Sequence, residues 1–414
     1  MMLSTLTEGQ AAPSEPEEDG ADAKVIDIDS ARLKVKKSFA RTTLGIEKDT
    51  LFPRLSYSEL KVGRVLGKGG FATVREILTI TPKKEFCNQG SFSFRSWADI
   101  TGASNGTAPS QDEEQYVPDF DPDFDESEFQ SKKFIADYCT GRHGEARYVI
   151  KAISPEVKRD ASKFLRAAMD MAIETQFLSV LDHPHIIRMR AVGNGDMFDK
   201  DYFLVLDRLY DTLDDRIEKW ILELKRAKTF VGKLRGGKTK KKKLFIERLS
   251  VAKNLASAMG HLHGLNIIYR DLKPENIGFD VKNVVKLFDF GLSKELHPDE
   301  KSSNGTYRLT PCTGSVRYMA PEVSNKYPYN LSVDIYSFGL LLWETLSMEV
   351  PFQGYNAAMF KEMVANFGDR PKTMDSWPQS LTNLIKSCWD GKFKRRPPFA
   401  EVVTALDKEI AELS

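Results

Sequence analysis

The chain has 414 residues, enough for one large domain or two or three smaller ones. Its 60 Lys and Arg residues nearly balance 59 Asp and Glu residues, so no general polyelectrolyte partner is implied and nucleic acid is not expected. Four scattered cysteines argue against a disulfide framework, and no signal peptide or apolar run long enough for a membrane span is evident. These features predict an intracellular soluble protein, cytoplasmic or, on account of a basic run described below, nuclear.

The first part of the chain, residues 1–54, is predicted to be a disordered tail. It is acidic at first and then mixed in charge, with few aromatic residues. A regulatory tail and a solvated tail without a specific role are both open. Order is expected to begin near Leu55.

Two strand-like segments flank a glycine-rich turn. Residues 60–66 alternate loosely between apolar and polar side chains, and residues 74–80 are also strand-like. The turn consists of Gly67, Lys68, Gly69, Gly70, Phe71, Ala72, Thr73 and Val74. Glycine permits positive φ angles and a close backbone approach, so such a turn can hold its amides over phosphates, although alone it is more typical of an ordinary hairpin.

An acidic insertion is predicted at residues 83–147. Within it, residues 111–129 carry nine acidic and no basic side chains, interleaved with aromatic ones. The alternatives are a disordered insertion and a docking segment for a basic surface. Its length without a periodic pattern favours disorder.

The next strand, residues 148–153, contains a lysine within an apolar, β-branched run. Burying Lys151 is costly unless an anionic partner is near. A helix predicted at residues 162–181 carries Glu174, and an ion pair between the two would satisfy the lysine and aim its ammonium at phosphates. Strands at residues 186–192 and 202–206 complete a five-stranded antiparallel lobe.

A basic insertion is predicted at residues 225–243, which hold ten basic and no acidic residues. We expect a flexible, solvated loop. Nuclear import, nucleic-acid binding and contact with the acidic insertion are the alternatives. The pattern is mainly helical on both sides of this insertion, with helices expected at residues 244–263 and 332–346.

A loop at residues 269–276 concentrates reactive polar groups between two apolar runs. Asp271 can accept a proton from an attacking hydroxyl, Lys273 can steady a negatively charged group in transit, and Asn276 can offer an oxygen to Mg²⁺. Eighteen residues after Asp271, the carboxylate of Asp289 follows a strand at residues 284–288 and precedes Phe290 and Gly291. That position suits a second Mg²⁺ ligand bridging phosphate oxygens.

These motifs, followed by Ala320, Pro321 and Glu322, resemble those of eukaryotic protein kinases over residues 55–410, with residues 411–414 as a C-terminal end. The resemblance implies a two-lobed α+β fold. The small N-terminal lobe would hold the five antiparallel strands and one main helix, and the larger lobe would be mainly helical. Cys388, Trp389, Arg396, Pro397 and Phe399 are similar to the tyrosine-kinase-like group of Ser/Thr kinases.

The resemblance also implies roles for individual residues. Lys151, paired with Glu174, would contact the α- and β-phosphates of ATP, Asp271 would act as the base, and Lys273 would stabilise the transferring phosphoryl group. Asn276 and Asp289 would hold Mg²⁺. The nucleotide site would comprise Gly67, Lys68, Gly69, Gly70, Val74, Val149, Lys151, Leu206, Asp207 and Leu209, with Leu206 as gatekeeper and residues 206–209 as the hinge.

Further contacts follow from the same resemblance. They are an ion pair between Arg396 and Glu322, an anchoring of the catalytic-loop backbone by Asp334, hydrogen bonds of Ser315 with Asp271 and Lys273, and an apolar column of Leu178, Tyr269 and Phe290. Two departures stand out. Tyr269 replaces the commoner histidine, and Gly278 replaces a larger apolar residue beneath the adenine, which is expected to loosen nucleotide affinity or admit a bulkier base.

The expected function is phosphoryl transfer from ATP to Ser or Thr hydroxyls of protein substrates, because Lys273 within Lys-Pro-Glu-Asn resembles the Ser/Thr-type loop. Arg270 requires an anion, so phosphorylation of Thr306 or Thr310 by an upstream kinase is expected to order the activation segment, residues 289–322. The competing interpretation is a pseudokinase scaffold that binds partners through its insertions. A scaffold has no need of the complete charged set.

Overall fold

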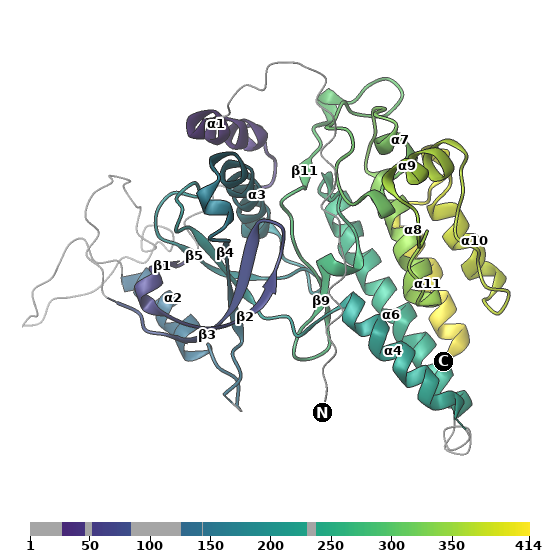
Figure 1. The fold of residues 1–414 in the computed structure, drawn as a ribbon, viewed down its shortest axis with the longest axis horizontal. Coiled ribbons are helices and arrows are strands. Elements are labelled where there is room, and N and C mark those ends of the chain that lie inside the picture. The colour runs from purple at the N-terminus through teal and green to yellow at the C-terminus, as the bar shows by residue number, and fades with distance from the viewer. Residues whose placement is uncertain (1–26, 46–51, 84–125, 143, 230–236) are drawn as a thin grey trace, which may run out of the picture.

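The computed structural model describes residues 27–45, 52–83, 126–142, 144–229 and 237–414. Figure 1 shows a lobe built around a sheet and a second lobe of helices beside it. This arrangement confirms the two-lobed α+β fold that the sequence predicts. Among the described residues, no helix combines the length and apolar character needed to cross a membrane.

The N-terminal lobe contains one six-stranded sheet in the order β1-β5-β6-β4-β3-β2. The strands are β1 (Arg54–Leu55), β2 (Leu60–Lys68), β3 (Ala72–Ile80), β4 (Tyr148–Ile153), β5 (Met189–Gly193) and β6 (Phe203–Asp207). Strands β2 to β6 pair antiparallel, as predicted. The short β1 adds a sixth strand, paired parallel to β5.

Helix α3 (Ala161–Val180) packs against this sheet and is the helix predicted around Glu174. It begins at Asp160, whose side chain accepts hydrogen bonds from the backbone N–H groups of Ser162 and Lys163. Its buried face includes Phe164, Met171 and Phe177. A buried glutamate, Glu174, lies on the same helix, facing the sheet.

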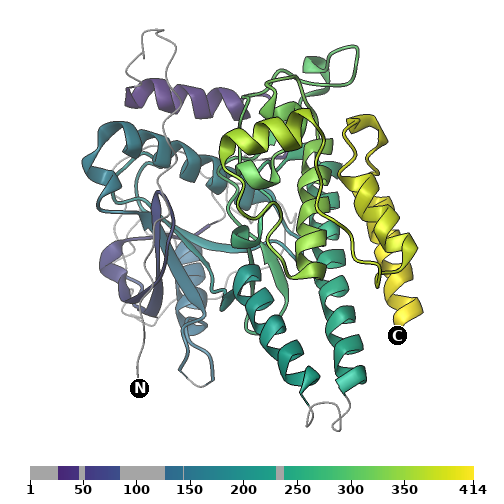
Figure 2. The ribbon, with the colours of Figure 1, turned by 45° about the vertical axis from the view of Figure 1, so that its right-hand side comes forward.

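The expectation of a disordered tail is wrong for residues 28–39, which form helix α1 (Ile28–Phe39). Figures 1 and 2 show α1 lying across α3. Only Ala31 and Val35 of α1 are buried, so the sequence lacks the periodic apolar pattern from which a helix is predicted. Residues 1–26 and 46–51 of the predicted tail lie outside the described residues.

Both predicted insertions contain helices at their edges, contrary to expectation. Helix α2 (Glu126–Asp137) covers the outer face of the sheet, where Ile135 joins a core cluster with residues of β3, β4 and β6. Helices α4 (Leu213–Lys228) and α6 (Gly237–Gly264) extend into the two ends of the basic run, because exposed lysines are compatible with a helix surface. Residues 84–125, 143 and 230–236 lie outside the described part.

The C-terminal lobe is built on α6 and α8 (Ser332–Ser347), with α10 (Gln379–Cys388) and α11 (Phe399–Leu413) packed around them. Its short elements are β7 (Asp211–Thr212), β8 (Ile267–Ile268), β9 (Ile277–Phe279), β10 (Val285–Leu287), β11 (Lys294–Glu295), α7 (Pro321–Ser324) and α9 (Ala357–Met359). Single 3-10 turns occur at Tyr57–Glu59, Val157–Arg159, Pro274–Asn276, Pro298–Glu300, Val316–Tyr318 and Phe393–Arg395, and a π-helix at Phe360–Asn366.

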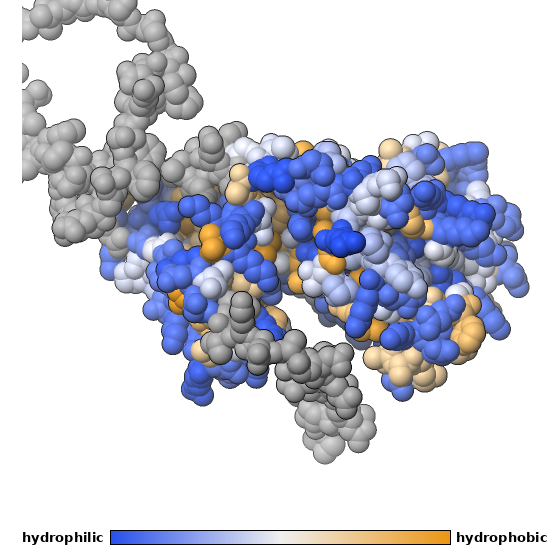
Figure 3. Space-filling model, turned by 90° about the horizontal axis from the view of Figure 1, so that it is seen from above, coloured by the Kyte–Doolittle hydropathy of each residue, from blue (hydrophilic) through white to orange (hydrophobic). Residues whose placement is uncertain are grey.

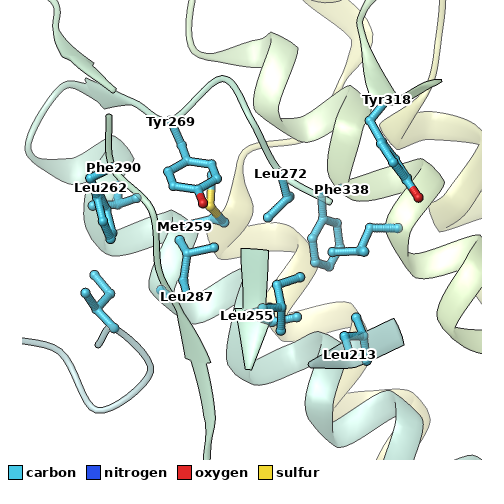
Figure 4. Close-up of a cluster of buried hydrophobic side chains, with 14 of the residues drawn as sticks. Leu213, Leu255, Met259, Leu262, Tyr269, Leu272, Leu287, Phe290, Tyr318 and Phe338 are labelled. Carbon is cyan, nitrogen blue, oxygen red and sulfur yellow. The ribbon is translucent and has the colours of Figure 1, made fainter. Parts of the chain in front are cut away.

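One continuous apolar core runs through both lobes. In Figure 4 the side chains of Met259, Tyr269, Leu272 and Phe338 lie within it, beneath the loop that follows β8. The reactive loop at residues 269–276 therefore rests on packed side chains, which restrict where its polar groups can lie.

Candidate active site

The loop after β8 is fixed from below by a buried carboxylate of α8. Asp334, 0% exposed, accepts hydrogen bonds from the backbone N–H groups of Tyr269 (2.9 Å) and Arg270 (2.8 Å). A ring nitrogen of His263 lies 3.0 Å from the same side chain. The predicted anchoring of the loop by Asp334 is confirmed, and it explains how Arg270 can hold a positive φ of 71°.

Both carboxylate oxygens of Asp271 are held by hydrogen-bond donors. The amide of Asn276 donates to Oδ2 at 2.8 Å, and the Lys273 ammonium lies 2.9 Å from the same oxygen. Ser315 donates to Oδ1 through its backbone N–H (3.0 Å) and its hydroxyl (2.8 Å). Lys273 also donates to the Ser315 hydroxyl at 3.0 Å, so both predicted contacts of Ser315 are confirmed.

Sequence reasoning missed Gly314, which allows Ser315 to reach Asp271. Gly314 has a φ of +94°, and a Cβ there would lie 2.1 Å from the carbonyl oxygen of Arg270. Only glycine fits this position without moving the catalytic-loop backbone. A glycine immediately before a serine in the activation segment is the signal that the sequence offers.

The ammonium of Lys151 lies between two carboxylates. It is 2.6 Å from Glu174 of α3 and 3.4 Å from Asp289. Burial lowers the pKa of Lys151, but attraction to Asp289 and Glu174 outweighs it, so its pKa lies above the ordinary value. Lys151 in turn lowers the pKa of Asp289, whereas burial raises that of Glu174. The predicted ion pair between Lys151 and Glu174 is present.

A column of apolar side chains supports this ion pair. Leu178, Tyr269 and Phe290 are all at most 3% exposed, and the rings of the last two meet edge to face with centroids 5.4 Å apart. Tyr269 also donates its hydroxyl to the backbone carbonyl of Phe288. Tyrosine in place of the commoner histidine therefore packs and satisfies its polar tip.

The two lobes enclose a cavity of about 640 Å³ that gathers the predicted residues. Among its lining residues are Gly67, Lys68, Gly69, Gly70, Val74, Val149, Lys151, Glu174, Leu206, Asp207, Leu209, Asp271, Lys273, Asn276 and Asp289. Such a concave site between two lobes, with convergent polar groups, is where a ligand is held. Residues separated by more than 200 positions in the sequence thus meet in one place.

The family model described as the protein kinase domain matches residues 136–405, more than half of the chain. The chain belongs to the protein kinase family. The match begins after the glycine-rich hairpin, beyond most of the insertion that separates β3 from β4 in sequence. The fold nevertheless places β2 and β3 next to β4, so the hairpin belongs to the same lobe of the kinase.

Curated relatives carry several kinds of kinase name. Dual specificity protein kinase shkB of Dictyostelium discoideum is 39% identical over 160 residues, 38% of this chain and 24% of the relative. Serine/threonine-protein kinase STY17 of Arabidopsis thaliana is 36% identical over 165 residues, which are 40% of this chain and 28% of the relative. Serine/threonine/tyrosine-protein kinase HT1 of Arabidopsis is 36% identical over 162 residues, 39% of each chain. The match thus covers well under half of each relative.

Asp170 is a cavity residue of the kinase that the sequence did not single out. Asp170 lies one helical turn before Glu174 on α3 and lines the cavity. A Cβ added to Gly291 would lie 3.0 Å from the Cβ of Asp170. Burial, followed by the nearby carboxylate of Asp289, raises its pKa to about 7. The spacing of four residues from Glu174 places both side chains on one helix face, which is the signal available in the sequence.

The backbone conformation of the glycines in the β2–β3 turn differs from expectation. None of Gly67, Gly69 and Gly70 has a positive φ. A Cβ on Gly67 or Gly70 would meet no atom within 4 Å, so the space above these residues is open. Their small size, rather than an unusual backbone conformation, leaves room for a ligand to approach the backbone amides.

Gly278 does not leave an enlarged pocket in the kinase. A Cβ at this position would lie 2.6 Å from Cδ1 of Leu209 and 3.1 Å from its Cβ. The side chain of Leu209, which lines the cavity, occupies the space that a larger residue 278 would fill. The small residue on β9 and the large residue at the hinge therefore compensate each other.

The predicted metal ligands fit a cation that brings other ligands with it. Asn276 uses its amide N–H groups toward Asp271, which leaves its side-chain oxygen available, and Asp289 lines the same cavity. Within the described ranges, no group of three or more His, Cys, Asp or Glu residues could hold a metal by itself. Mg²⁺ commonly takes one or two protein ligands together with phosphate oxygens and water, so two side-chain oxygens suit it.

Proposed function

We propose that this kinase transfers the γ-phosphoryl group of ATP to Ser and Thr hydroxyls of protein substrates. The observation that carries the proposal is the arrangement around Asp271. Its carboxylate shares one cavity with Lys273 and with the ion pair between Lys151 and Glu174. These are the base, the charge-stabilising group and the phosphate-binding group that phosphoryl transfer requires.

Each side chain has a defined task in the proposal. Asp271, oriented by Ser315 and Asn276, accepts the proton of the substrate hydroxyl. Lys273 offsets the negative charge of the group in transit, and Lys151 binds phosphate oxygens in the position that Glu174 gives it. Asn276 and Asp289 would hold Mg²⁺, which would neutralise charge on the phosphoryl group that ATP would supply. The hinge at residues 206–209 binds the adenine.

Transfer to Ser and Thr is favoured over transfer to Tyr by Lys273 within the Lys-Pro-Glu-Asn loop. The names of the relatives include serine/threonine, dual-specificity and serine/threonine/tyrosine kinases, so family membership leaves the acceptor residue type open. A pseudokinase scaffold is the competing function. It is disfavoured because Lys151, Glu174, Asp271 and Asp289 are all present in one cavity.

The test is incorporation of labelled phosphate from ATP into a generic basic protein, followed by phosphoamino-acid analysis. We expect phosphoserine and phosphothreonine to hold nearly all of the label, and chelation of divalent metal to abolish it. Phosphotyrosine as the main product would contradict the acceptor. Equal incorporation by wild type and the Asp271→Asn variant would refute the role proposed for Asp271.

The proposed control of activity is phosphorylation of the activation segment by an upstream kinase. Thr306 is 1% exposed and bonds Asn304 through its hydroxyl, whereas Thr310 is exposed. Thr310 is therefore the site open to a modifying enzyme, and Arg270 is the cation proposed to meet the phosphate. Phosphopeptide mapping of highly active protein should find Thr310 modified; an active preparation with Thr310 unmodified would refute this.

A cytoplasmic signalling role, with the nucleus as the alternative location, completes the proposal.

Replacing Leu209 by alanine is expected to raise the KM for ATP about ten-fold. The change removes most of a part-buried leucine side chain from the cavity wall beside Gly278, and full burial of a leucine contributes about 1.5–3 kcal/mol, of which a part-buried one contributes a share. Steady-state kinetics with varied ATP measures the effect. Leu209→Met, which conserves volume, is the matched control. Adding Gly278→Leu to Leu209→Ala should restore the KM, and a double variant as weak as Leu209→Ala would disprove the compensation.

A further inference from the structure

Residues 28–44, here called the strap, bind the outer side of helix α3. Ala31 and Val35 of α1 are buried, and the rings of Phe39 and Phe177 meet edge to face with centroids 5.3 Å apart. Arg32 pairs at 3.1 Å with Asp196 in the connection between β5 and β6. The first part of the strap is therefore attached to the N-terminal lobe, on the helix that carries Glu174.

The end of the strap holds a buried carboxylate of the activation segment. Glu295, 4% exposed, accepts hydrogen bonds from the hydroxyls of Thr42 (2.6 Å) and Thr43 (2.8 Å) and from the backbone N–H of Thr43 (3.0 Å). Within the part of the chain that the structure describes, these are the hydrogen bonds to this carboxylate. A buried carboxylate loses its compensation when such donors leave, so the contact couples the strap to the segment.

Glu295 lies next to the catalytic loop. It belongs to β11, where it pairs with Ile267 of β8, the strand from which the loop of Asp271 begins. Strap residues thus contact the helix that positions Glu174 and the strand that follows Asp289. Figures 1 and 2 show α1 extending from above α3 towards the C-terminal lobe. The strap joins two elements whose relative position sets the geometry of the active site.

Thr43 is accessible, although the carboxylate that it binds is buried. The residue as a whole is exposed, and its hydroxyl is part-buried in the hydrogen bond to Glu295. The face of the molecule seen from above, on the side where α1 lies, is mostly hydrophilic (Figure 3). Lys36, Lys37 and Arg41 precede it in sequence, and such basic residues favour recognition by basophilic kinases through charge. Arg41 itself pairs with Asp299 and Glu300 beyond β11.

We propose that Thr43 is a phosphorylation site and that a phosphate there releases the strap from Glu295. In the reaction, a bond forms between Thr43 Oγ1 and the γ-phosphorus of ATP, the bond to the bridging oxygen of ADP breaks, and the modifying kinase's base takes the hydroxyl proton. A hydrogen-bond donor thereby becomes a group of charge near −2, placed against a buried carboxylate. Asp299 and Glu300, which pair with Arg41 of the strap, bring further negative charge to this end of it.

The first arm of the test compares full-length chains with Thr43→Glu and Ser38→Glu. Ser38 is exposed on α1, and among the described residues its hydroxyl bonds the helix backbone at Lys34, so Ser38→Glu adds the same charge away from Glu295. We expect amide hydrogen exchange in residues 28–39 to accelerate about ten-fold or more in Thr43→Glu and to change little in Ser38→Glu. Exchange in α8 serves as the internal standard for intact folding. Equal exchange in both variants would overturn the proposal.

The second arm identifies the opposing group and the modification. Glu295→Gln keeps an acceptor for the Thr43 hydroxyl and removes the charge, so Thr43→Glu with Glu295→Gln should recover protection of α1. Failure to recover it would show that repulsion by Glu295 is not the cause. Wild-type protein incubated with ATP and a basophilic Ser/Thr kinase should carry phosphate on Thr43 by mass spectrometry. Thr43 left unmodified while Thr310 or Ser38 is phosphorylated would exclude it as a site.

The exchange measurements do not depend on the kinase activity proposed for this chain. An inactive protein whose α1 still responds to Thr43→Glu would refute the proposed function and leave the inference standing. In an active protein, release of the strap should also lower kcat/KM, since α3 loses the contacts that hold Glu174 beside Lys151.

Discussion

Replacing Asp271 by asparagine is expected to lower kcat by about 10³-fold, within the range typical for loss of a general acid or base. The carboxamide cannot accept a proton from the substrate hydroxyl. The carboxamide also matches the hydrogen-bond donors around position 271 poorly. Oδ2 of Asp271 receives the Asn276 amide and the Lys273 ammonium, both donors, and Ser315 donates twice to Oδ1. Whichever side the new NH₂ group takes, it faces donors instead of acceptors.

Steady-state kinetics with saturating ATP and a peptide substrate measures this loss, while ATP binding measured separately should change only a few-fold. Ser315→Ala is the graded control. It removes the hydroxyl donor but keeps the backbone N–H of residue 315 on Asp271, so its kcat should fall by about ten-fold, the equivalent of one hydrogen bond to a charged group. An Asp271→Asn variant that retains a tenth or more of wild-type kcat would show that another group accepts the proton.

The side chains proposed to be catalytic could be predicted from the sequence because each lies in, or shortly after, a recognisable element. Lys151 is in a β-branched strand, Glu174 is on a helix with a regular apolar face, and Asp289 follows a short strand by two residues. Their order along the chain then limits which can meet. The residue that the sequence did not single out is Gly314, whose positive φ and missing Cβ let Ser315 reach Asp271.

Helices α1 and α2 could not be predicted because tertiary contacts stabilise them. Helix α1 buries only Ala31 and Val35, too few to form a periodic apolar pattern. Helix α2 buries Lys132, which reaches within 4 Å of Glu59 and Glu128, and a buried lysine contradicts any simple rule of apolar burial. Each helix depends on a surface that exists only after the lobes have folded.

The compensation in volume between Gly278 and Leu209 illustrates a second limit of prediction from the sequence. Gly278 taken alone indicates a wider pocket, yet Leu209 fills that space from a position 69 residues earlier in the chain. Compensation between residues that far apart has no local pattern.

Raising the pH from about 5 to above 8 is expected to destabilise the C-terminal lobe through Glu344. This residue of α8 is 3% exposed, and Tyr318 donates its hydroxyl to Oε2 at 2.7 Å. Burial raises the pKa of Glu344 to about 8, with Asp214 and Glu275 adding to the effect, while Tyr318 and Arg317 oppose it. In the unfolded chain the pKa returns to about 4.5, the value of an ordinary glutamate.

The sign follows from proton binding. Between these two pKa values the folded protein keeps the proton and the unfolded chain loses it, so the free energy of unfolding falls as the pH rises, by up to about 5 kcal/mol for the full shift. Glu344→Gln keeps an acceptor for Tyr318 and cannot ionise. Denaturant titrations at several pH values should therefore show equal stability of the two proteins near pH 4 and a widening advantage of the variant up to pH 8. Glu349→Gln, at an exposed position just beyond α8, should follow the wild type throughout. Parallel curves for wild type and Glu344→Gln would mean that Glu344 is already ionised in the folded protein at neutral pH, with its charge compensated by groups such as Arg317.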